Sequence, residues 1–363
     1  KNNIQMQINL SSKKLNMSLK NLSVENKIPK KLKEKLFNKR IKKIYKKFKN
    51  SFNIEDNYIV AISGGPDSLA LAFLTKIYSI KNNLRSRYFI VDHKLRKESA
   101  KEAKSVKKIL KRFSINVEIL RWLGKKPIKN IQSLARKKRY ELLFSQCKKL
   151  NIKNIVLGHH SDDAIENFFI RMLRGSGLKG LVSLDKKTKI NNFTLLRPLL
   201  GFNKEDLKYL SKKVFNFYVE DPSNKDIKFK RIKIRNLLTE LEQNGLDKKK
   251  FLLTLNNLKY SDEVISFYVD KNLKENTYYN KKKNVLVINN NFFDNPYEII
   301  LRSLSIVIKT VGMKEYPARG KKIDNIIRKI TNNTLAVETL GGCIIKKVNR
   351  TIILEKEHQN DTC

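Results

Sequence analysis

The sequence predicts an α/β fold: a Rossmann-like parallel sheet forms a catalytic domain, followed by a helical linker and a small α+β C-terminal domain. Short apolar strands alternate with helical stretches, which is typical of a parallel sheet with covering helices. The predicted strands lie at residues 59–62, 87–93, 116–120 and 154–160, with helices around 100–113 and 131–150 between them. Polar motifs follow several of these strands, and ligands of such sheets bind beyond the carboxyl ends of the strands.

The first strand leads into the segment Ser63-Gly64-Gly65-Pro66-Asp67-Ser68 and then into an apolar-rich helix. The two glycines permit backbone conformations closed to other residues, and Pro66 suits a first helical turn because its missing N–H costs nothing there. Unpaired amides and the positive end of a helix dipole therefore meet at one point, which favours phosphate. The alternative interpretation is a simple helix cap in which Asp67 and Ser68 complement the dipole.

The two common nucleotide motifs are not found at this junction, since neither Gly-Lys-Ser/Thr nor G-x-G-x-x-G occurs there. The segment instead resembles the SGGxDS loop of the ATP pyrophosphatases, which cleave ATP between the α- and β-phosphates. The resemblance implies that the loop amides and serines hold pyrophosphate and that Asp67 helps to bind Mg²⁺. ATP and Mg²⁺ are therefore the expected cofactors.

Three of the four histidines directly follow predicted strands, namely His93, His159 and His160. The helix after His160 begins with acidic residues: Asp162, Asp163 and Glu166. These acids could serve only as partners of the helix dipole. A zinc site is a second alternative, but no CxxC pair supports it. We favour a cleft lined by acids and histidines opposite the ATP loop.

Several motifs in a fixed order resemble tRNA(Ile)-lysidine synthetase. They are GHHSDDAIENFFIRMLRGSGLKGL (158–181), RPLL (197–200) and EDPSN (220–224) with Arg231, Ile234 and Arg235, supported by VDHKLR (91–96) and LARKKRY (134–140). The similarity runs from about Tyr58 to Leu238, and LGGCIIKKV (340–348) is similar to the family's small C-terminal domain. The chain departs from the family where Lys94 replaces a usual Gly, Asn167 a usual Thr and Ile232 a common Asn.

The resemblance implies a two-step reaction on the wobble cytidine of tRNA(Ile) with a CAU anticodon. The C2 oxygen attacks the α-phosphate of ATP, and free lysine then displaces AMP to leave lysidine. The implied catalytic residues are Asp67, Asp163, His159 and Arg136. The implied nucleotide-binding residues are Ser63, Gly64, Gly65, Pro66, Asp67, Ser68, Asp92 and His93. The implied metal ligands are Asp67 and Asp162, and the residues assigned to lysine or cytidine are His160, Glu166 and Arg174.

The net charge indicates a class of partner, and the length and sequence pattern predict the domain organisation. A formal net charge of +44 over 363 residues favours a polyanionic partner, although the surplus is spread along the chain and an AT-rich genome would also enrich lysine. We predict a basic N-terminal arm and helix at 1–50, the catalytic domain at 51–236, a helical linker that contacts tRNA at 237–280 and a C-terminal domain at 281–363.

The sequence also indicates a compartment and two rival functions. No apolar run reaches the ~18 residues of a membrane span, the start lacks a signal-peptide pattern, and the three cysteines are far apart, so we expect a cytoplasmic protein. The working expectation for the assembly is a homodimer. The rivals are a tRNA thiolase of the same superfamily, which usually needs catalytic cysteines or a cluster, and a basic RNA-binding protein without catalysis.

Overall fold

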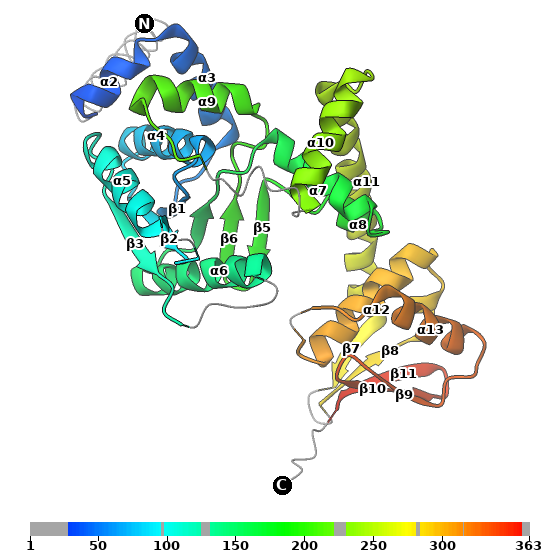
Figure 1. The fold of residues 1–363 in the computed structure, drawn as a ribbon. Helices are drawn as coiled ribbons and strands as arrows, with labels where there is room; N and C mark the ends of the chain where they lie inside the picture. Colours follow the sequence, from blue (N-terminus) through cyan, green and yellow to red (C-terminus); the bar gives the residue numbers. More distant parts are fainter. Residues whose placement is uncertain are drawn as a thin grey trace, which may run out of the picture. The chain divides into compact units, whose positions relative to one another are not determined.

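The computed structural model describes residues 28–95, 98–124, 131–220, 230–280, 284–314 and 316–357. The chain divides into two compact units, one ending at Leu252 and the other beginning at Leu253 (Figure 1). The arm predicted at residues 1–27 lies outside the described residues, and the division into four parts stays a prediction. Across the described ranges, no helix is both long and apolar enough to cross a membrane.

The first unit is built on a six-stranded sheet with the order β3-β2-β1-β4-β6-β5. All neighbouring strands pair in parallel except β5 and β6, which form an antiparallel hairpin at the edge. The α/β prediction is thereby confirmed, although the hairpin was not predicted. The strands are β1 (Tyr58–Ile62), β2 (Ser86–Asp92), β3 (Val117–Arg121), β4 (Asn154–Val156), β5 (Lys187–Ile190) and β6 (Phe193–Leu196).

Helices cover both faces of this sheet, as the strand-helix alternation predicts (Figure 1). One apolar core joins the sheet to α4, α5 and α9 and extends to the N-terminal helices α2 and α3. A second core, on the other face, joins the sheet to α6 through Leu143 and Cys147. The bounds are α2 (Lys30–Leu36), α3 (Lys39–Ser51), α4 (Pro66–Lys81), α5 (Ser99–Lys111), α6 (Ile131–Leu150) and α9 (Lys204–Phe215).

The position of the site follows from the strand order. The chain proceeds from β1 to β2 and β3 on one side and then returns to place β4 on the other side of β1. Ile59 of β1 therefore pairs with both Arg87 and Ile155. At such a switch point the loops leaving two adjacent strands diverge, and ligands bind in the crevice between them.

A smaller helical layer follows β4 in the chain and includes α7 and α10. Helices α7 and α10 pack through Ile165, Phe169, Ile234 and Leu238, and Phe251 stacks on Phe169 with ring centroids 5.4 Å apart. This packing fixes the face that α10 turns toward the start of α7. The bounds are α7 (Ser161–Met172), α8 (Leu178–Leu181), α10 (Lys230–Gln243) and α11 (Lys248–Asn276).

The second unit contains a five-stranded antiparallel sheet with the order β7-β8-β11-β10-β9. Two amphipathic helices, α12 and α13, bury isoleucine-rich faces in the same core as this sheet. The bounds are β7 (Thr277–Asn280), β8 (Val285–Ile288), the 3-10 helix η2 (Asn290–Phe293), α12 (Tyr297–Val311), α13 (Gly320–Thr331), β9 (Val337–Leu340), β10 (Cys343–Val348) and β11 (Thr351–Lys356).

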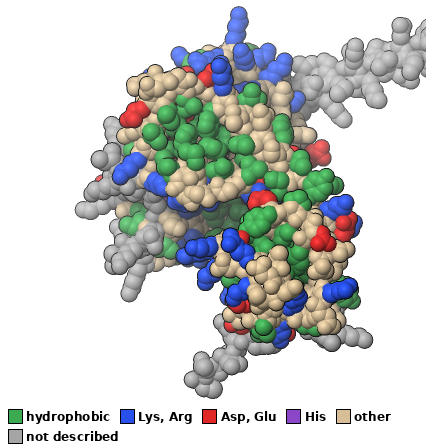
Figure 2. All heavy atoms as spheres, turned by 90° about the vertical axis from the view of Figure 1, so that its right-hand side faces the viewer, with side chains coloured by type: hydrophobic (Ala, Val, Ile, Leu, Met, Phe, Trp, Pro, Cys, Tyr) green, Lys and Arg blue, Asp and Glu red, His purple; other side chains and the backbone are tan. Residues whose placement is uncertain are grey.

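On the face shown in Figure 2, the positive charge is not confined to one patch. Figure 2 shows Lys and Arg side chains spread over the face in view, among scattered acids and an exposed apolar area. Basic residues also occur along the whole sequence. Charge alone therefore does not locate a partner on this protein.

Candidate active site at the carboxyl ends of β1 and β4

Ser68 organises the glycine-rich loop that follows β1. Its hydroxyl oxygen accepts hydrogen bonds from the backbone N–H of Ser63 (3.2 Å) and of Gly64 (3.1 Å), and it donates to the carbonyl oxygen of Gly65 (2.9 Å). The Ser63 hydroxyl lies 3.2 Å from the same oxygen. One buried side chain thus ties the loop to the first turn of α4, which begins at Pro66 as the sequence predicts. Direct contact of Ser68 with phosphate stays a prediction.

Gly64 is required by both conformation and space. Its φ is +88°, and a Cβ at this position would lie 2.8 Å from Val106 Cγ2 and 3.1 Å from Val219 Cγ2. The Gly64 carbonyl oxygen also accepts a hydrogen bond from the N–H of Val219 (2.9 Å). Gly65 differs, because it is the N-cap of α4 with a φ of −69° and a Cβ there would meet only Ser63 Oγ at 3.8 Å.

His160 caps α7 beside this loop. Its Nδ1 accepts a hydrogen bond from the N–H of Asp162 (3.3 Å), and its own N–H donates to Asp163 Oδ2 (3.0 Å), which completes a capping box. Because Nδ1 accepts, Nε2 carries the proton in the neutral ring. Nε2 lies 3.6 Å from both Asp67 Oδ2 and Asp163 Oδ2, so this buried ring joins the loop carboxylate to the α7 carboxylate.

The environments of Asp67 and Asp163 move their pKa values in opposite directions. Burial is the main cause that raises the pKa of Asp67, opposed by the charges of His160 and Lys204. Burial also acts upward on Asp163, but His160, His159 and the His160 N–H together hold its pKa below the usual value. Asp163 is therefore an ionised carboxylate at neutral pH, which makes it a weak proton acceptor and a strong partner for a cation.

Glu166 lies buried one turn further along α7 and is neutralised by α10. Arg235 Nε is 2.5 Å from Glu166 Oε1, and Arg231 Nε is 3.6 Å from Glu166 Oε2. Arg231 also approaches Asp163 at 4.0 Å. Both arginines belong to motifs that resemble the family, but the sequence alone does not assign them to the site. Their spacing of four residues, which places both on one helix face, was the available signal.

Two histidines at strand ends are neutral. Burial is the main cause that lowers the pKa of His93 to about 4, with a further contribution from Arg139. Burial likewise lowers the pKa of His159 to about 4, although Asp163 acts upward. The Nδ1 atoms of both rings are buried, and no hydrogen-bond partner for either is found among the described residues.

Asp92 organises the turn after β2. It is buried, and its Oδ1 accepts hydrogen bonds from the N–H of Lys94 (3.0 Å) and the hydroxyl of Ser99 (2.8 Å). Lys94 has a φ of +52°. Glycine adopts this left-handed conformation more readily than lysine does. Nucleotide binding by Asp92 and His93 stays a prediction.

The remaining predicted residues lie at different distances from this cluster. Asp162 Oδ1 is 3.9 Å from Lys248 Nζ, at the start of α11. Arg136 is near enough for its charge to lower the pKa of His159, and its guanidinium packs over the Tyr140 ring. Arg174 follows the C-terminal end of α7, whereas the cluster adjoins the first turn of this 12-residue helix. The structure does not bring Arg174 to the other residues.

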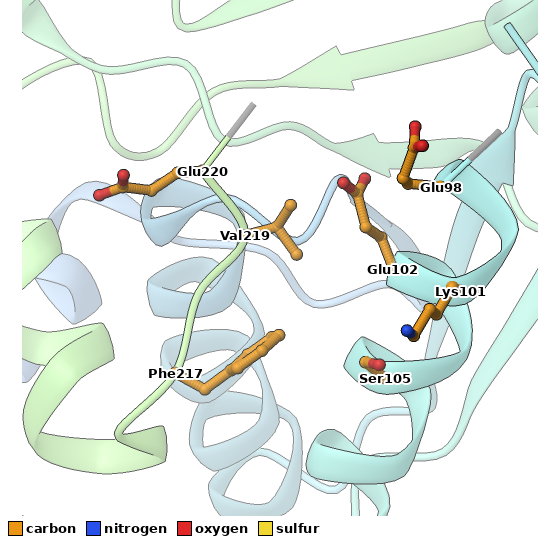
Figure 3. Close-up of a pocket in the computed structure, with 7 residues that line it drawn as sticks. All are labelled: Glu98, Lys101, Glu102, Ser105, Phe217, Val219 and Glu220. Carbon is orange, nitrogen blue, oxygen red and sulfur yellow. The ribbon is translucent and has the colours of Figure 1, made fainter. Parts of the chain in front are cut away.

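A pocket of about 330 Å³ adjoins the glycine-rich loop on the side of α5 (Figure 3). The N–H of Val219 donates to the Gly64 carbonyl oxygen, and the Val219 side chain points into the space between its own segment and α5. The carboxylates of Glu98, Glu102 and Glu220 lie along one side of this space. The lining residues are Glu98, Lys101, Glu102, Ser105, Phe217, Val219 and Glu220, and none of them is a predicted site residue. Residues 221–224 of the EDPSN motif lie outside the described residues.

The zinc alternative finds no support in the described ranges, where no group of three His, Cys, Asp or Glu side chains is arranged to hold a metal ion. Cysteine chemistry is not supported either. Cys147 is buried in α6, where burial raises the pKa of its thiol to about 12, and Cys343 is buried in the second unit. Cys363 lies outside the described residues.

Comparison with solved structures supports the fold assignment. The chain resembles a U34-tRNA thiolase from Methanococcus maripaludis that carries a [4Fe-4S] cluster, with a TM-score of 0.53 and 18% identity over 62% of this chain and 80% of that one. At this level of identity the likeness concerns the fold alone. It confirms the Rossmann-like architecture of the first unit.

Comparison with protein families and curated relatives is more specific. Residues 33–242 match the PP-loop domain family, an ATP-binding family. The tRNA(Ile)-lysidine synthase of Wolbachia pipientis wMel is 33% identical over 312 residues, which span 85% of this chain and 72% of the relative. The enzyme of the same name from Orientia tsutsugamushi is 34% identical over 324 residues, spanning 85% of this chain and 71% of the relative. The chain therefore belongs to the tRNA(Ile)-lysidine synthase family of PP-loop proteins.

Proposed function

We propose that this chain ligates free lysine to C2 of the wobble cytidine of tRNA(Ile) with a CAU anticodon. ATP first adenylates the base, and the products are lysidine, AMP and pyrophosphate. The observation that carries the proposal is the similarity to lysidine synthases over 85% of the chain, which extends from the PP-loop domain into the second unit. The geometry at the ends of β1 and β4 supports it, because an anion-binding loop faces a carboxylate cluster there.

The glycine-rich loop fits the pyrophosphate part of ATP. The loop ends at the N-terminus of the 16-residue helix α4, where the helix dipole and the N–H groups of the first turn favour an anion. Because Ser68 already holds the loop in shape, the amides need little rearrangement when negative charge develops on the leaving pyrophosphate. Preorganised donors of this kind are usually the largest single contribution to catalysis.

The described residues also fit Mg²⁺ at Asp67. Its Oδ1 is a buried carboxylate oxygen without a hydrogen-bond partner among the described residues, so its lone pairs are available to bind a cation. Mg²⁺ is usually held by one or two carboxylates together with substrate phosphates and water. We therefore assign Asp67 as the metal ligand, with Asp162 as the second candidate. The ion would supply charge neutralisation for the phosphates.

The carboxylates of α7 fit the amino acid substrate. Asp163 is ionised, because its pKa is lowered, and it can attract the ammonium group of free lysine. Glu166 is paired with Arg235, so this ion pair presents both a guanidinium and a carboxylate to the charged groups of the amino acid. Neutral His159 offers an imidazole nitrogen that can accept a hydrogen bond from the attacking amine. These roles, together with a cytoplasmic location and a homodimeric assembly, belong to the proposal.

The rival functions fit the residues less well. Sulfur transfer would need a reactive cysteine or a cluster, whereas Cys147 is buried with a raised pKa. A binding protein without catalysis would explain the +44 charge but not the unpaired Asp67 oxygen beside a phosphate loop. Ligation therefore accounts for more of the observed geometry than either alternative.

A labelling experiment tests the proposed function. We expect the purified chain, with ATP, Mg²⁺ and labelled lysine, to fix label into a CAU-anticodon tRNA(Ile) in an alkali-stable form. The Asp67→Ala variant should lose at least about 10²-fold in AMP formation, the scale for removing one preorganised stabiliser of developing charge. A tRNA with U at the wobble position should stay unlabelled.

Three results would contradict the proposal. Label that is released by mild alkali would indicate an aminoacyl ester, and incorporation of sulfur would indicate a thiolase. Near-normal AMP formation by Asp67→Ala would remove the assignment of the metal ligand. The Asp56→Ala variant is a matched control, because Asp56 is an exposed carboxylate just before β1.

A further inference from the structure

The glycine-rich loop uses most of its own N–H groups internally. The N–H groups of Ser63 and Gly64 donate to Ser68 Oγ, and Pro66 has no N–H to donate. The Gly65 N–H has no hydrogen-bond partner among the described residues. Gly65 is the N-cap of α4, where the helix terminus favours an anion. Gly65 is therefore the loop residue whose N–H is available to a phosphate.

The peptide unit that carries this N–H is held from its other side by Val219. The Gly64 carbonyl oxygen accepts a hydrogen bond from the N–H of Val219 (2.9 Å). The peptide bond between Gly64 and Gly65 is trans, so the Gly64 carbonyl oxygen and the Gly65 N–H point in opposite directions. The bond from Val219 therefore turns the Gly65 N–H away from Val219.

A second contact holds the start of α4. Ser211, in α9, is fully buried, and its hydroxyl donates to the Pro66 carbonyl oxygen (2.5 Å) across 145 positions of sequence. Like the Val219 bond, this contact reaches the loop from outside and joins it to α9 and the segment that follows. We refer to the Ser211 hydroxyl and the Val219 N–H together as the α9 clamp.

Packing of α9 fixes the position of the α9 clamp. Asn216 ends this helix with a left-handed φ of +49°, and its N–H donates to the Lys212 carbonyl oxygen. Val219 follows three residues later and packs, half-buried, against the same core as α9. The buried α9 residues that share this core with α4 are Leu207, Leu210, Val214 and Phe215. The two donors of the clamp are thus held by a rigid apolar contact between two helices.

We propose that the α9 clamp positions the glycine-rich loop for the reaction, so that the Gly65 N–H donates to the pyrophosphate part of ATP. This role rests on the proposed function, since that function identifies the ligand. Donors that are already oriented stabilise developing charge without the cost of reorientation. Ser211 and Val219 act through Pro66 and Gly65, so both are positioning residues and not catalytic residues.

Two variants remove the donors of the α9 clamp one at a time. Ser211→Ala removes the hydroxyl, and α-hydroxyvaline in place of Val219 removes the N–H while the side chain stays. Each should bind pyrophosphate with Mg²⁺ about 5-fold or more weakly than the wild type, the scale of one lost hydrogen bond. Isothermal titration calorimetry measures the affinity, and thermal unfolding shows that each variant is folded.

The Gly65 amide supplies a readout that a loss of stability alone would not change. The chain has 13 glycines, so isotope-labelled glycine gives a simple amide spectrum by nuclear magnetic resonance. The Gly65→Ala variant identifies the Gly65 resonance, since a Cβ there meets only Ser63 Oγ at 3.8 Å. Pyrophosphate should shift this resonance in the wild type, and the shift should be smaller in both clamp variants.

Matched controls remove equivalent groups away from the loop. Ser79→Ala removes a buried hydroxyl from the last turn of α4, where it donates to the Lys76 carbonyl oxygen (2.9 Å). An α-hydroxy acid at Ile115 removes a buried N–H that donates to the Leu110 carbonyl oxygen (3.0 Å). Both controls should bind pyrophosphate and shift the Gly65 resonance as the wild type does.

Three results would overturn the α9 clamp. They are wild-type pyrophosphate affinity in both clamp variants, an equal effect of the controls, and a Gly65 resonance that pyrophosphate does not move in the wild type.

The α9 clamp and the proposed function can fail separately, because pyrophosphate binding and the Gly65 resonance need neither tRNA nor lysine. A wild type whose Gly65 response depends on the clamp but which forms no lysidine would support the clamp and contradict the proposed function. A chain that forms lysidine equally well without either donor would do the reverse.

Discussion

Two adjacent glycines show how a single motif contains residues of different kinds. Gly64 has a positive φ and is enclosed by Val106 and Val219, so both its conformation and its lack of a Cβ contribute to stability. Gly65 has an ordinary φ and open space around the position of a Cβ. The sequence marks both as equivalent members of an SGGxDS loop. Only the surroundings reveal that the first is also structural.

We expect Gly64→Ala to lower the free energy of unfolding by about 2 kcal/mol or more, because a left-handed residue costs about 1–2 kcal/mol and the methyl group also meets Val106. Gly65→Ala should change it by less than about 0.5 kcal/mol. Urea unfolding of the two variants and the wild type measures the difference. Equal stability of the two variants would contradict the assignment.

At the scale of elements, strands β2 and β4 each lead into a desolvated histidine. His93 faces Arg139 and Asp92, and His159 faces Asp163, Arg197, Arg136 and Arg231. The ends of neighbouring parallel strands therefore carry neutral rings between a set of guanidinium groups and a set of carboxylates. A histidine whose pKa is lower in the folded state takes up its proton more readily when the chain unfolds.

These histidines predict how stability depends on pH. The folded pKa values are about 4 and the unfolded value is about 6.5, so the unfolded chain binds more protons between these limits. The contribution of the two neutral histidines to the free energy of unfolding is fully present above about pH 6.5. It is lost as the pH falls toward about 4, because the unfolded chain then takes up protons that the folded chain does not. Urea unfolding should show that the double variant His93→Gln/His159→Gln loses less stability than the wild type between pH 7 and 4.5.

The difference between the two proteins should be constant above pH 7, where both rings are neutral in the folded and unfolded states alike. This range serves as the internal control, because the substitutions also change packing. A wild type and a double variant with parallel stability curves down to pH 4.5 would show that the rings are not desolvated as the structure indicates.

At the scale of the whole molecule, charge and function are separate questions. On the face shown in Figure 2, Lys and Arg side chains are spread among acids and apolar groups, whereas the candidate nucleotide and lysine residues occupy one edge of one sheet. A large positive net charge attracts RNA without selecting a sequence. Specificity for one tRNA must then come from the site and from the shape of the RNA.

We expect tRNA affinity to fall steeply with salt. If about six to ten phosphates are contacted, the loss between 50 and 200 mM salt should be about 10³–10⁵-fold by duplex-DNA calibration, and somewhat smaller for folded RNA. A filter-binding titration measures it. A flat titration would mean that the lysine content reflects composition and not RNA binding.

The sequence by itself determined the parallel sheet and the family, and it predicted the glycine-rich loop and most of the candidate residues. These features depend on local patterns, such as β1 leading into Ser63–Ser68 and β4 leading into His159 and the acids of α7. Apolar periodicity and turn chemistry act over a few residues and are readable without a fold. The β5–β6 hairpin was missed because β5 has the sequence KTKI and lacks the apolar run that marks the other strands of the sheet.

The tertiary structure decided which of these residues act together. Pairing of Glu166 with Arg235 spans 69 positions, and Arg139 reaches His93 across 46, so neither contact has a local signal. The structure also places Arg174 away from the cluster, at the far end of α7, and gives Ser68 and Asp92 roles in shaping their own turns. Strand order and helix packing set such distances, because contacts between remote residues depend on the whole fold and not on their neighbours in sequence.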